Sequence, residues 1–362
     1  MKEVQMKRII IFTLLCFMQY FVFAQTPTND SHWQLKWQDN FDTFDTNKWI
    51  KGHNAVHGNP EEPQLYLESQ VFTSNGNLVL TLNNTKVTCP APGVYSGVCN
   101  QCTNGKQYNY RSGLVETKED YNTQFGYIEA RIKFPYREGK KWGVWPAFWV
   151  WHGWNAPYSN AAEIDICEIF ARNNPPDRFE HGIVRFYGPN PPREAWGITH
   201  VFSNFSYADW HTYAIEWNPS RIIWYLDGKA ITSLSNHKIV DPVRIILNLA
   251  VLKENAYLPQ TSPYFEEKMY VDYVKVYQLK CDKNTVVNEI SNFNTYNYAV
   301  KKSISLSNAT TIPANSNISL RATDFIELKA GFEVQTGREL YLDVNPMPGE
   351  CAVSAPIDIK RK

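Results

Sequence analysis

Short runs of alternating apolar and polar residues recur along most of the chain, from residue 32 to residue 279. The runs include "NLVLTL", "YIEARIKF", "RIIWYLDGKAI", "PVRIILNLAV" and "MYVDYVKVYQL", and turn signals such as "SNGN" and "LDGK" interrupt them. Alternation with a period of two places the apolar side chains on one face of a β-strand. Because long stretches with a helical period are missing, the pattern predicts an all-β sandwich or jelly roll.

The pattern changes after Cys281. The segment "CDKNTVVNEISNFNTYN" is polar and rich in Asn, and we expect it to be a linker. Residues 303–344 then alternate in very short runs, which predicts a second, small all-β module. Because a core this small stabilises a fold only weakly, a disulfide between Cys281 and Cys351 would help to hold it. We therefore predict a main domain over residues 31–280 and an accessory module with its linker over residues 281–362.

The N-terminal segment has the pattern of an export signal. Lys7 and Arg8 precede the apolar run "IIIFTLLCFMQYFVFA", and Ala24 before Gln25 offers a small-residue cleavage point. The pattern predicts a signal peptide over residues 1–24, whereas a retained membrane anchor is less favoured because the run is short. We expect a protein that is secreted, periplasmic or at the cell surface, with no membrane contact after cleavage.

The charge balance restricts the partners of the protein. Of the 362 residues, 36 are Lys or Arg and 36 are Asp or Glu, so the formal net charge is zero. Such a chain has no overall field that attracts nucleic acid or an anionic membrane. We expect no nucleic-acid partner, a monomer, and a ligand that is neutral or bound by a local charged patch.

Six cysteines follow the expected cleavage point. In an oxidising compartment, the cluster "CPAPGVYSGVCNQC" predicts a loop closed by a disulfide. A zinc site formed by Cys89, Cys99 and Cys102 is the alternative, but a second CxxC or HxxxH at ligand spacing is missing. The spacing leaves the pairing of these cysteines open.

The segment "AAEIDICEIF" places three carboxylates, Glu163, Asp165 and Glu168, among apolar residues. Strict strand alternation puts Glu163 and Asp165 on one face and Glu168 on the other. One extra residue in a β-bulge near Ile166 and Cys167 would bring Glu168 to the face of the other two. We predict this bulge; acids on a half-exposed surface strand are the alternative.

A cluster of aromatic residues precedes the acidic segment. The stretch "KWGVWPAFWVWHGW" contains five tryptophans, namely Trp142, Trp145, Trp149, Trp151 and Trp154. Sugar rings present apolar C–H faces that lie flat on aromatic rings, while their hydroxyl groups need polar partners. Carboxylates beside tryptophans therefore favour a glycan ligand, although we expect some of these rings to serve only in core packing.

The acids also suit a reaction on a glycan. Hydrolysis of a glycosidic bond with retention needs two carboxyl groups about 5 Å apart, one ionised to attack the anomeric carbon and one protonated. Glu163 and Glu168 are the candidates for this pair. Asp165 between them would keep the two glutamates in opposite protonation states through its charge and hydrogen bonds.

Several segments in order resemble glycoside hydrolase family 16, the retaining endo-β-glycanases with a concanavalin-like jelly-roll fold. They are "FDTFDTNKW", "YRSGLVETKEDYNTQFGYIEARIKFP", "WPAFW", "EIDICE", "WHTYAIEW" with "IWYLDGK", and "MYVDYVKVYQ". The resemblance implies that Glu163 is the nucleophile, Glu168 the general acid/base and Asp165 the residue that supports the nucleophile. It also implies that Trp145 and Trp149 line the cleft, and we add Trp154 to the expected substrate-binding residues. Catalysis in such a protein needs no cofactor.

Two departures from the family pattern concern the substrate. Ala162 stands where β-1,3-glucanases usually have Gly, and Ile183 and Arg185 stand where they have Thr and His. We expect Arg185 to face the cleft. Three further arginines lie in the same region, namely Arg172, Arg178 and Arg193. Together with Arg185 they would bind an anionic polysaccharide. A solvated basic loop is the alternative.

The preferred substrate is β-1,3- or mixed-linkage β-glucan. The alternatives are a red-algal galactan of the agar, porphyran or carrageenan type, transglycosylation by the same residues, and a jelly roll that binds carbohydrate without catalysis.

The resemblance further implies a structural calcium ion on the convex face. The matching ligands are Asn40, a carbonyl near Gly76, and Asp272, and such oxygen ligands suit Ca²⁺. Asn40 stands where an acid is usual, and Asp272 is equally suited to cap a strand end. We expect His181 and His211 to be packed or hydrogen-bonded rather than catalytic.

Overall fold

The structure of the protein is a computed structural model. It describes residues 33–57, 62–90, 97, 99–137, 143–152, 161–170, 176–186, 193–253, 263–293, 296, 298–307, 309–313, 317–336, 339–344 and 351–352. The expected signal peptide lies outside these residues. Within them the regular structure consists of β-strands and two short 3-10 turns, η2 (Glu68–Gln70) and η3 (Glu119–Tyr121). No helix of the described part has the length and apolar character needed to cross a membrane.

Two large sheets form the main body. The seven-stranded sheet has, in spatial order, β16 (Arg193–Val201), β15 (Arg178–Phe186), β14 (Ala162–Glu168), β13 (Val144–His152), β20 (Arg244–Val251), β11 (Leu114–Thr117) and β2 (Trp49–Lys51). All of its neighbouring strands run antiparallel.

The central path of the sixteen-stranded sheet is β19 (Lys229–Ser235), β18 (Arg221–Leu226), β17 (His211–Trp217), β12 (Gly126–Lys133), β21 (Glu266–Val287), β6 (Asn77–Asn83), β10 (Tyr110–Ser112), β4 (Gln64–Tyr66), β3 (Ala55–Val56) and β8 (Asn100–Gln101). The strands that join this path from the side are β1 (Trp33–Asp39), β5 (Val71–Ser74), β22 (Val300–Leu306), β23 (Asn317–Leu328), β24 (Glu339–Val344) and β25 (Cys351–Ala352). A separate two-stranded ladder pairs β7 (Val87–Thr88) with β9 (Gln107–Tyr108).

The two sheets pack face to face around one large apolar core. Phe148, Ile164 and Leu247 of the seven-stranded sheet are fully buried in it, together with Ile128 and Trp224 of the other sheet. These residues are the apolar members of the alternating runs, so each strand contributes one face to the core. The predicted all-β jelly-roll sandwich is confirmed.

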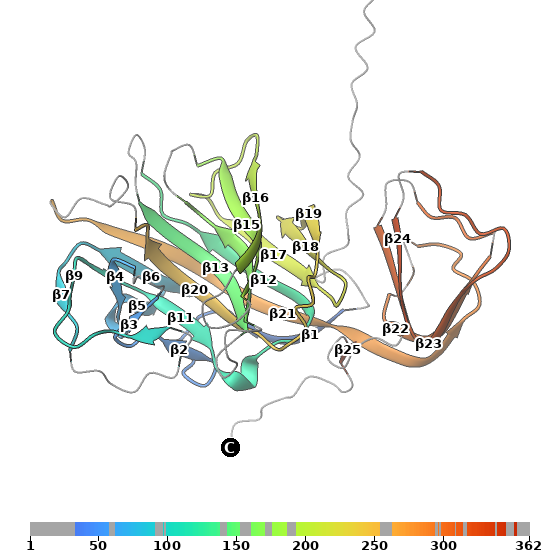
Figure 1. Cartoon of the computed structure of the whole chain (residues 1–362), viewed down its shortest axis with the longest axis horizontal. Coiled ribbons are helices and arrows are strands. Elements are labelled where there is room, and N and C mark those ends of the chain that lie inside the picture. Colours follow the sequence, from blue (N-terminus) through green and yellow to red (C-terminus); the bar gives the residue numbers. More distant parts are fainter. Residues whose placement is uncertain are drawn as a thin grey trace, which may run out of the picture.

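Strand β21 joins the sandwich to the C-terminal module. It is 22 residues long, pairs with β6 and β12 in its first part, and pairs in parallel with β22 from Cys281 onward. Figure 1 shows it running along the sandwich and on into the module at the right. The polar segment after Cys281 is therefore not the linker that its composition suggested. Its first residues, up to Val287, pair with β22, and Ile290 and Phe293 bury their side chains in the module core.

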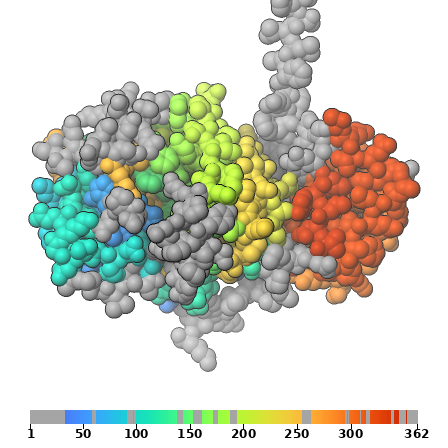
Figure 2. All heavy atoms as spheres, viewed as in Figure 1, coloured from blue at the N-terminus to red at the C-terminus, as the bar shows by residue number. Residues whose placement is uncertain are grey.

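The module is a small stack of parallel strands that rests on the sandwich. Strands β22, β23 and β24 pair in parallel around an apolar core of its own. Arg321 of β23 is almost fully buried, and its Nη2 lies 3.6 Å from Oε1 of Glu216 in β17. Arg221 of β18 donates to the Ser319 hydroxyl at 2.7 Å. Figure 2 shows the module in red against the part of the sandwich drawn in yellow.

Two disulfides close loops of different length. Cys89 pairs with Cys102, and Cys281 with Cys351, at sequence separations of 13 and 70. The prediction of a stapled loop is confirmed, and the zinc alternative is wrong because two of its three proposed ligands are disulfide-bonded. Cys99 is a free, buried thiol.

Candidate active site

Strand β14 carries the predicted bulge. In its pairing with β13, Trp149 lies opposite Asp165 and Phe148 lies opposite Cys167, which leaves Ile166 as the extra residue. The pairing of β14 with β15 shifts between Asp165 and Glu168 as well. The extra residue changes the parity of the strand, so Glu163, Asp165 and Glu168 share one face.

This face of the seven-stranded sheet, which we call the acidic face, points away from the inter-sheet core. Ala147 and Trp149 lie opposite Glu168 and Asp165, and both belong to an apolar cluster separate from that core. The cluster also contains Ala55 of β3 and Tyr66 of β4, so the β3–β4 region lies beside the acids. The acids therefore stand next to aromatic side chains, as the sequence pattern suggested.

A hydrogen bond across the core anchors the bulge. Nε1 of Trp224, from β18 in the opposite sheet, donates to the backbone carbonyl of Asp165 at 2.8 Å. Trp224 is fully buried, and the indole satisfies a carbonyl beside the irregular part of the ladder. This hydrogen bond thus fixes the backbone of Asp165 from the core side of the sheet.

Asp165 is the most buried of the three acids, with 5% of its surface exposed. Burial, followed by the charges of Glu168 and Glu163, raises its pKa well above the ordinary value of an aspartic acid. Asp165 also shares a hydrogen bond with Glu163. Both effects favour the protonated form of Asp165, and the hydrogen bond links it directly to the proposed nucleophile-side carboxyl of Glu163.

Glu168 is held in the acid form by similar causes. Burial and then the charge of Glu163 raise its pKa to about 8, although a hydrogen bond from Trp145 acts in the opposite direction. The Trp145 indole nitrogen lies 2.9 Å from Oε1 of Glu168. At neutral pH, Glu168 therefore carries a proton that it can give to a leaving group.

The tryptophans occupy different environments. Trp145 is partly exposed and lies 4.9 Å from the Phe170 ring, centroid to centroid. Trp149 is only 6% exposed, and its indole donates to Oδ1 of Asn248 at 2.8 Å, so this ring is mainly part of the sheet surface. Trp151 meets the Trp149 ring edge-on. Trp154 lies outside the described residues.

A hydrogen-bonded network beside the acids was missed by the sequence reasoning. Nδ1 of His57 lies 2.9 Å from Oε1 of Glu62, and Gln64 donates to Oε2 of Glu62 at 2.6 Å and to the Tyr66 hydroxyl at 2.8 Å. Asn248 donates to the same hydroxyl at 2.9 Å, which links the network to Trp149. The alternation of Glu62, Gln64 and Tyr66 in "EEPQLY" is the signal that places these three side chains on one face.

The structure corrects the expected position of Arg185. Arg185 pairs with Ala162 across β14 and β15, whereas Val184 pairs with Glu163. Arg185 therefore lies on the face opposite the acids, where Ala162 and Ile183 join the inter-sheet core. Arg185 is one residue away from Val184, and a shift of one residue along a strand turns the side chain to the other face.

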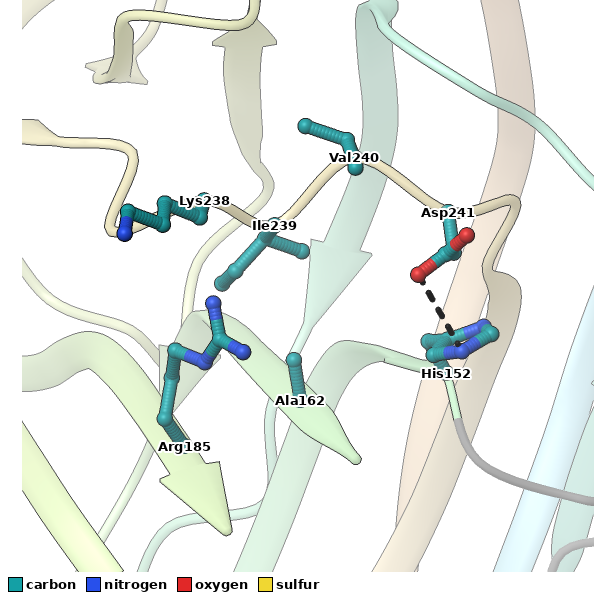
Figure 3. A pocket seen from close by; sticks show the side chains of 7 residues that line it. All are labelled: His152, Ala162, Arg185, Lys238, Ile239, Val240 and Asp241. Atoms are coloured by element: carbon teal, nitrogen blue, oxygen red, sulfur yellow. Dashed lines mark ion pairs between the residues drawn. The ribbon is translucent and has the colours of Figure 1, made fainter. Parts of the chain in front are cut away.

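Arg185 lines a pocket of about 270 Å³ between the seven-stranded sheet and the loop that follows β19. Figure 3 shows its guanidinium group near Ile239, with the ion pair between His152 and Asp241 on the other side. The guanidinium donates to the backbone carbonyl of His237. Of the other arginines, Arg178 pairs with Asp177 at 2.8 Å; the side chains of Arg172 and Arg193 are outside the described structure.

The expected calcium ligands do not form a suitable donor set. Oδ2 of Asp272 lies 2.6 Å from Nη1 of Arg131, so a cation already neutralises the only acid among the three. Gly76 lies near Asp42, and Asn40 is exposed. Within the described residues, no group of three or more His, Cys, Asp or Glu side chains is arranged to hold a metal ion.

The two histidines behave as expected. His181 is buried, stacks on His200 and contacts the Trp224 ring, and burial lowers its pKa to about 3. Nδ1 of His211, the first residue of β17, lies 2.7 Å from Oδ2 of Asp227. Neither ring belongs to the acidic face.

A jelly-roll sandwich with a bulged row of three acids, one of them held protonated near neutral pH, defines a carboxylate-based glycoside hydrolase site. The chain belongs to glycosyl hydrolases family 16, whose family model matches residues 61–275.

Known proteins resemble the chain over the same part. Glucan endo-1,3-beta-glucosidase A1 of Niallia circulans is 29% identical over 291 residues, which cover 70% of this chain and 39% of that protein. The beta-glucanase of Rhodothermus marinus is 28% identical over 276 residues, covering 68% of this chain and 86% of the relative. The solved structure of an endo-beta-1,3-glucanase from Pyrococcus furiosus is 26% identical, with a TM-score of 0.56 over 68% of this chain and 95% of that one. The chain thus spans well under half the length of the Niallia relative.

Proposed function

We propose that the protein is an endo-acting β-glycan hydrolase that works with retention on β-1,3- or mixed-linkage β-glucan. The observation that carries the proposal is the bulge at Ile166, which puts Glu163 and Glu168 on one face with Asp165 between them. The glucan-cleaving relatives support the choice of substrate.

The three acids have separate roles in the proposed reaction. The Glu163 carboxylate attacks the anomeric carbon while Glu168 gives its proton to the glycosidic oxygen, and the bond between that carbon and oxygen breaks. Glu168, now ionised, then takes a proton from water, the water oxygen attacks the anomeric carbon, and Glu163 is released. Asp165 shares a hydrogen bond with Glu163, which holds the nucleophile in position.

Aromatic rings on the acidic face are the proposed sugar-binding surface. Trp145 is partly exposed and hydrogen-bonded to Glu168, so a sugar on its ring would lie next to the proton donor. We assign Trp149 to the same surface, mainly as the buried ring beneath it. The proposal needs no cofactor, and a monomer suffices because all residues of the acidic row come from one chain.

Export of the protein is part of the proposal. The apolar run before Ala24 and the two disulfides support it, because disulfides form in oxidising compartments. The location we propose is secreted, periplasmic or at the cell surface.

The decisive experiment compares Glu163→Gln and Glu168→Gln with Glu119→Gln, an exposed glutamate of η3. We expect each of the first two variants to lose at least about 1,000-fold in kcat on laminarin or lichenan, with unchanged circular dichroism. Glu119→Gln should keep full activity. A Glu163→Gln protein that still hydrolyses glycan at a substantial rate contradicts the assignment.

The substrate class is tested with a panel of laminarin, lichenan, agarose, porphyran and carrageenan. We expect cleavage of laminarin and lichenan. Arg185, which would have favoured an anionic polysaccharide, lies on the face opposite the acids. Preference for a sulfated galactan would contradict the assigned glucan, and products longer than the starting oligosaccharide would show transglycosylation.

A further inference from the structure

Two charged side chains flank the acidic row from neighbouring elements. His57 follows β3 and stands on the side of Glu163, and Glu180 lies in β15 directly opposite Glu168. Neither residue stood out in the sequence, and neither has a role in the proposed reaction so far.

His57 is oriented by a buried partner. Its Nδ1 lies 2.9 Å from Oε1 of Glu62, whose side chain is only 3% exposed, and the Glu62 backbone N–H donates to the His57 carbonyl. The His57 ring also meets the Trp149 ring edge-on, with the centroids 5.6 Å apart. Because Trp149 pairs with Asp165 next to Glu163, this contact places the imidazole beside the proposed nucleophile.

The charge of His57 reaches Glu163. Burial acts to lower the pKa of His57, but the charges of Glu62 and Glu163 and the hydrogen bond to Glu62 outweigh it, so the pKa is raised. The charge of Lys253 acts weakly in the opposite direction. The raised pKa favours the positively charged form of His57 beside the Glu163 carboxyl.

Glu180 faces Glu168 across the strand pair. Residues directly opposite in an antiparallel pair have Cβ atoms about 5 Å apart, and like charges at this spacing repel each other. Of the other groups that act on Glu168, Glu163 and Glu62 also favour its protonated form, and Trp145 opposes them. Arg178 lies two residues before Glu180 but is held by Asp177.

We propose that His57 and Glu180 are positioning residues that keep the two catalytic carboxyls in opposite protonation states. His57 holds a positive charge beside Glu163, which favours the carboxylate. Glu180 holds a negative charge opposite Glu168, which favours the acid. The inference rests on the proposed roles of Glu163 and Glu168, and it adds an electrostatic gradient along the row.

The two charges predict opposite changes in the pH profile of kcat/KM on laminarin. In His57→Gln the nucleophile loses a nearby cation, so the acidic limb should move to higher pH by about one pH unit. In Glu180→Gln the acid loses a nearby anion, so the alkaline limb should move to lower pH by a similar amount. Each variant should leave the other limb almost in place.

Charge-preserving variants separate this role from a structural one. His57→Lys should keep the acidic limb, and Glu180→Asp the alkaline limb, close to its position in the wild-type protein. Thermal unfolding should confirm that all four variants are folded. A folded His57→Gln or Glu180→Gln protein whose limb does not move overturns the proposal for that residue, even if KM rises. Loss of activity in Glu163→Gln tests the proposed function separately, because it does not depend on the flanking charges.

Discussion

Trp145 donates its indole N–H to Oε1 of Glu168 at 2.9 Å, across the strand pair β13–β14. The hydrogen bond favours the ionised acid, yet burial and the charge of Glu163 still raise the pKa of Glu168 to about 8. The indole therefore orients the proposed proton donor without removing its proton.

The first prediction concerns this hydrogen bond. Trp145→Phe keeps an aromatic ring but removes the N–H, so the pKa of Glu168 should rise and the alkaline limb of the kcat/KM profile should move to higher pH. Looser orientation of the acid should lower kcat about tenfold at neutral pH. Trp210→Phe, whose ring packs on Arg131 of the other sheet, is the control and should change neither quantity. An alkaline limb that moves to lower pH would contradict the assigned bond.

The second prediction concerns stability and pH. The pKa of Glu168 is raised from 4.5 to about 8 in the folded protein, so the folded state binds more protons than the unfolded state between these pH values. The contribution of Glu168 to stability is therefore fully present below about pH 4.5 and is lost as pH rises toward 8. Glu168→Gln should raise the Tm at pH 8 by about 3 °C or more and have little effect at pH 4. Differential scanning calorimetry at both pH values tests this, and an equal rise at both would argue against a titrating group.

The third prediction concerns the anchor of the bulge. Trp224→Phe leaves the Asp165 carbonyl without its buried donor, which should lower the free energy of unfolding by about 2 kcal/mol and also disturb the acids. Trp217→Phe is a matched control, because Trp217 is equally buried and donates to the Ile239 carbonyl instead. Both variants should lose stability in urea unfolding, but only Trp224→Phe should lose kcat. Equal kcat in the two variants would show that the bulge needs no such anchor.

The fourth prediction concerns the C-terminal module. The Cys281–Cys351 disulfide closes a longer loop than Cys89–Cys102, with separations of 70 and 13 residues. Replacing both members by Ser should therefore lower the free energy of unfolding by about 4 kcal/mol for the first pair and about 3 kcal/mol for the second. The first replacement should also release β25, which pairs with β21 beside Cys351. Limited proteolysis should then cut the C-terminal end, and resistance equal to that of the unchanged protein would contradict this view.

The fifth prediction concerns calcium. Because Arg131 neutralises Asp272, we expect EDTA to leave both Tm and activity unchanged. A fall in Tm that added Ca²⁺ reverses would contradict the conclusion that these residues do not fit the ion.

The sequence by itself determined the local features of the protein. Alternation predicted the strands, and the parity of Glu163, Asp165 and Glu168 required one extra residue, which the register locates at Ile166. The two histidines were also predicted correctly: His181 is packed in the core, and His211 is hydrogen-bonded to Asp227.

Only the tertiary structure decided which distant residues join the acidic face. Arg185 was expected there, but its register with Ala162 turns it to the opposite face, because a shift of one residue reverses a side chain. His57 and Glu62 come to the acids from the β3–β4 region, and Glu180 comes through the pairing of β15 with β14, so no single stretch of sequence contains the arrangement. For the same reason, the polar segment after Cys281 resembled a linker until its pairing with β22 was known.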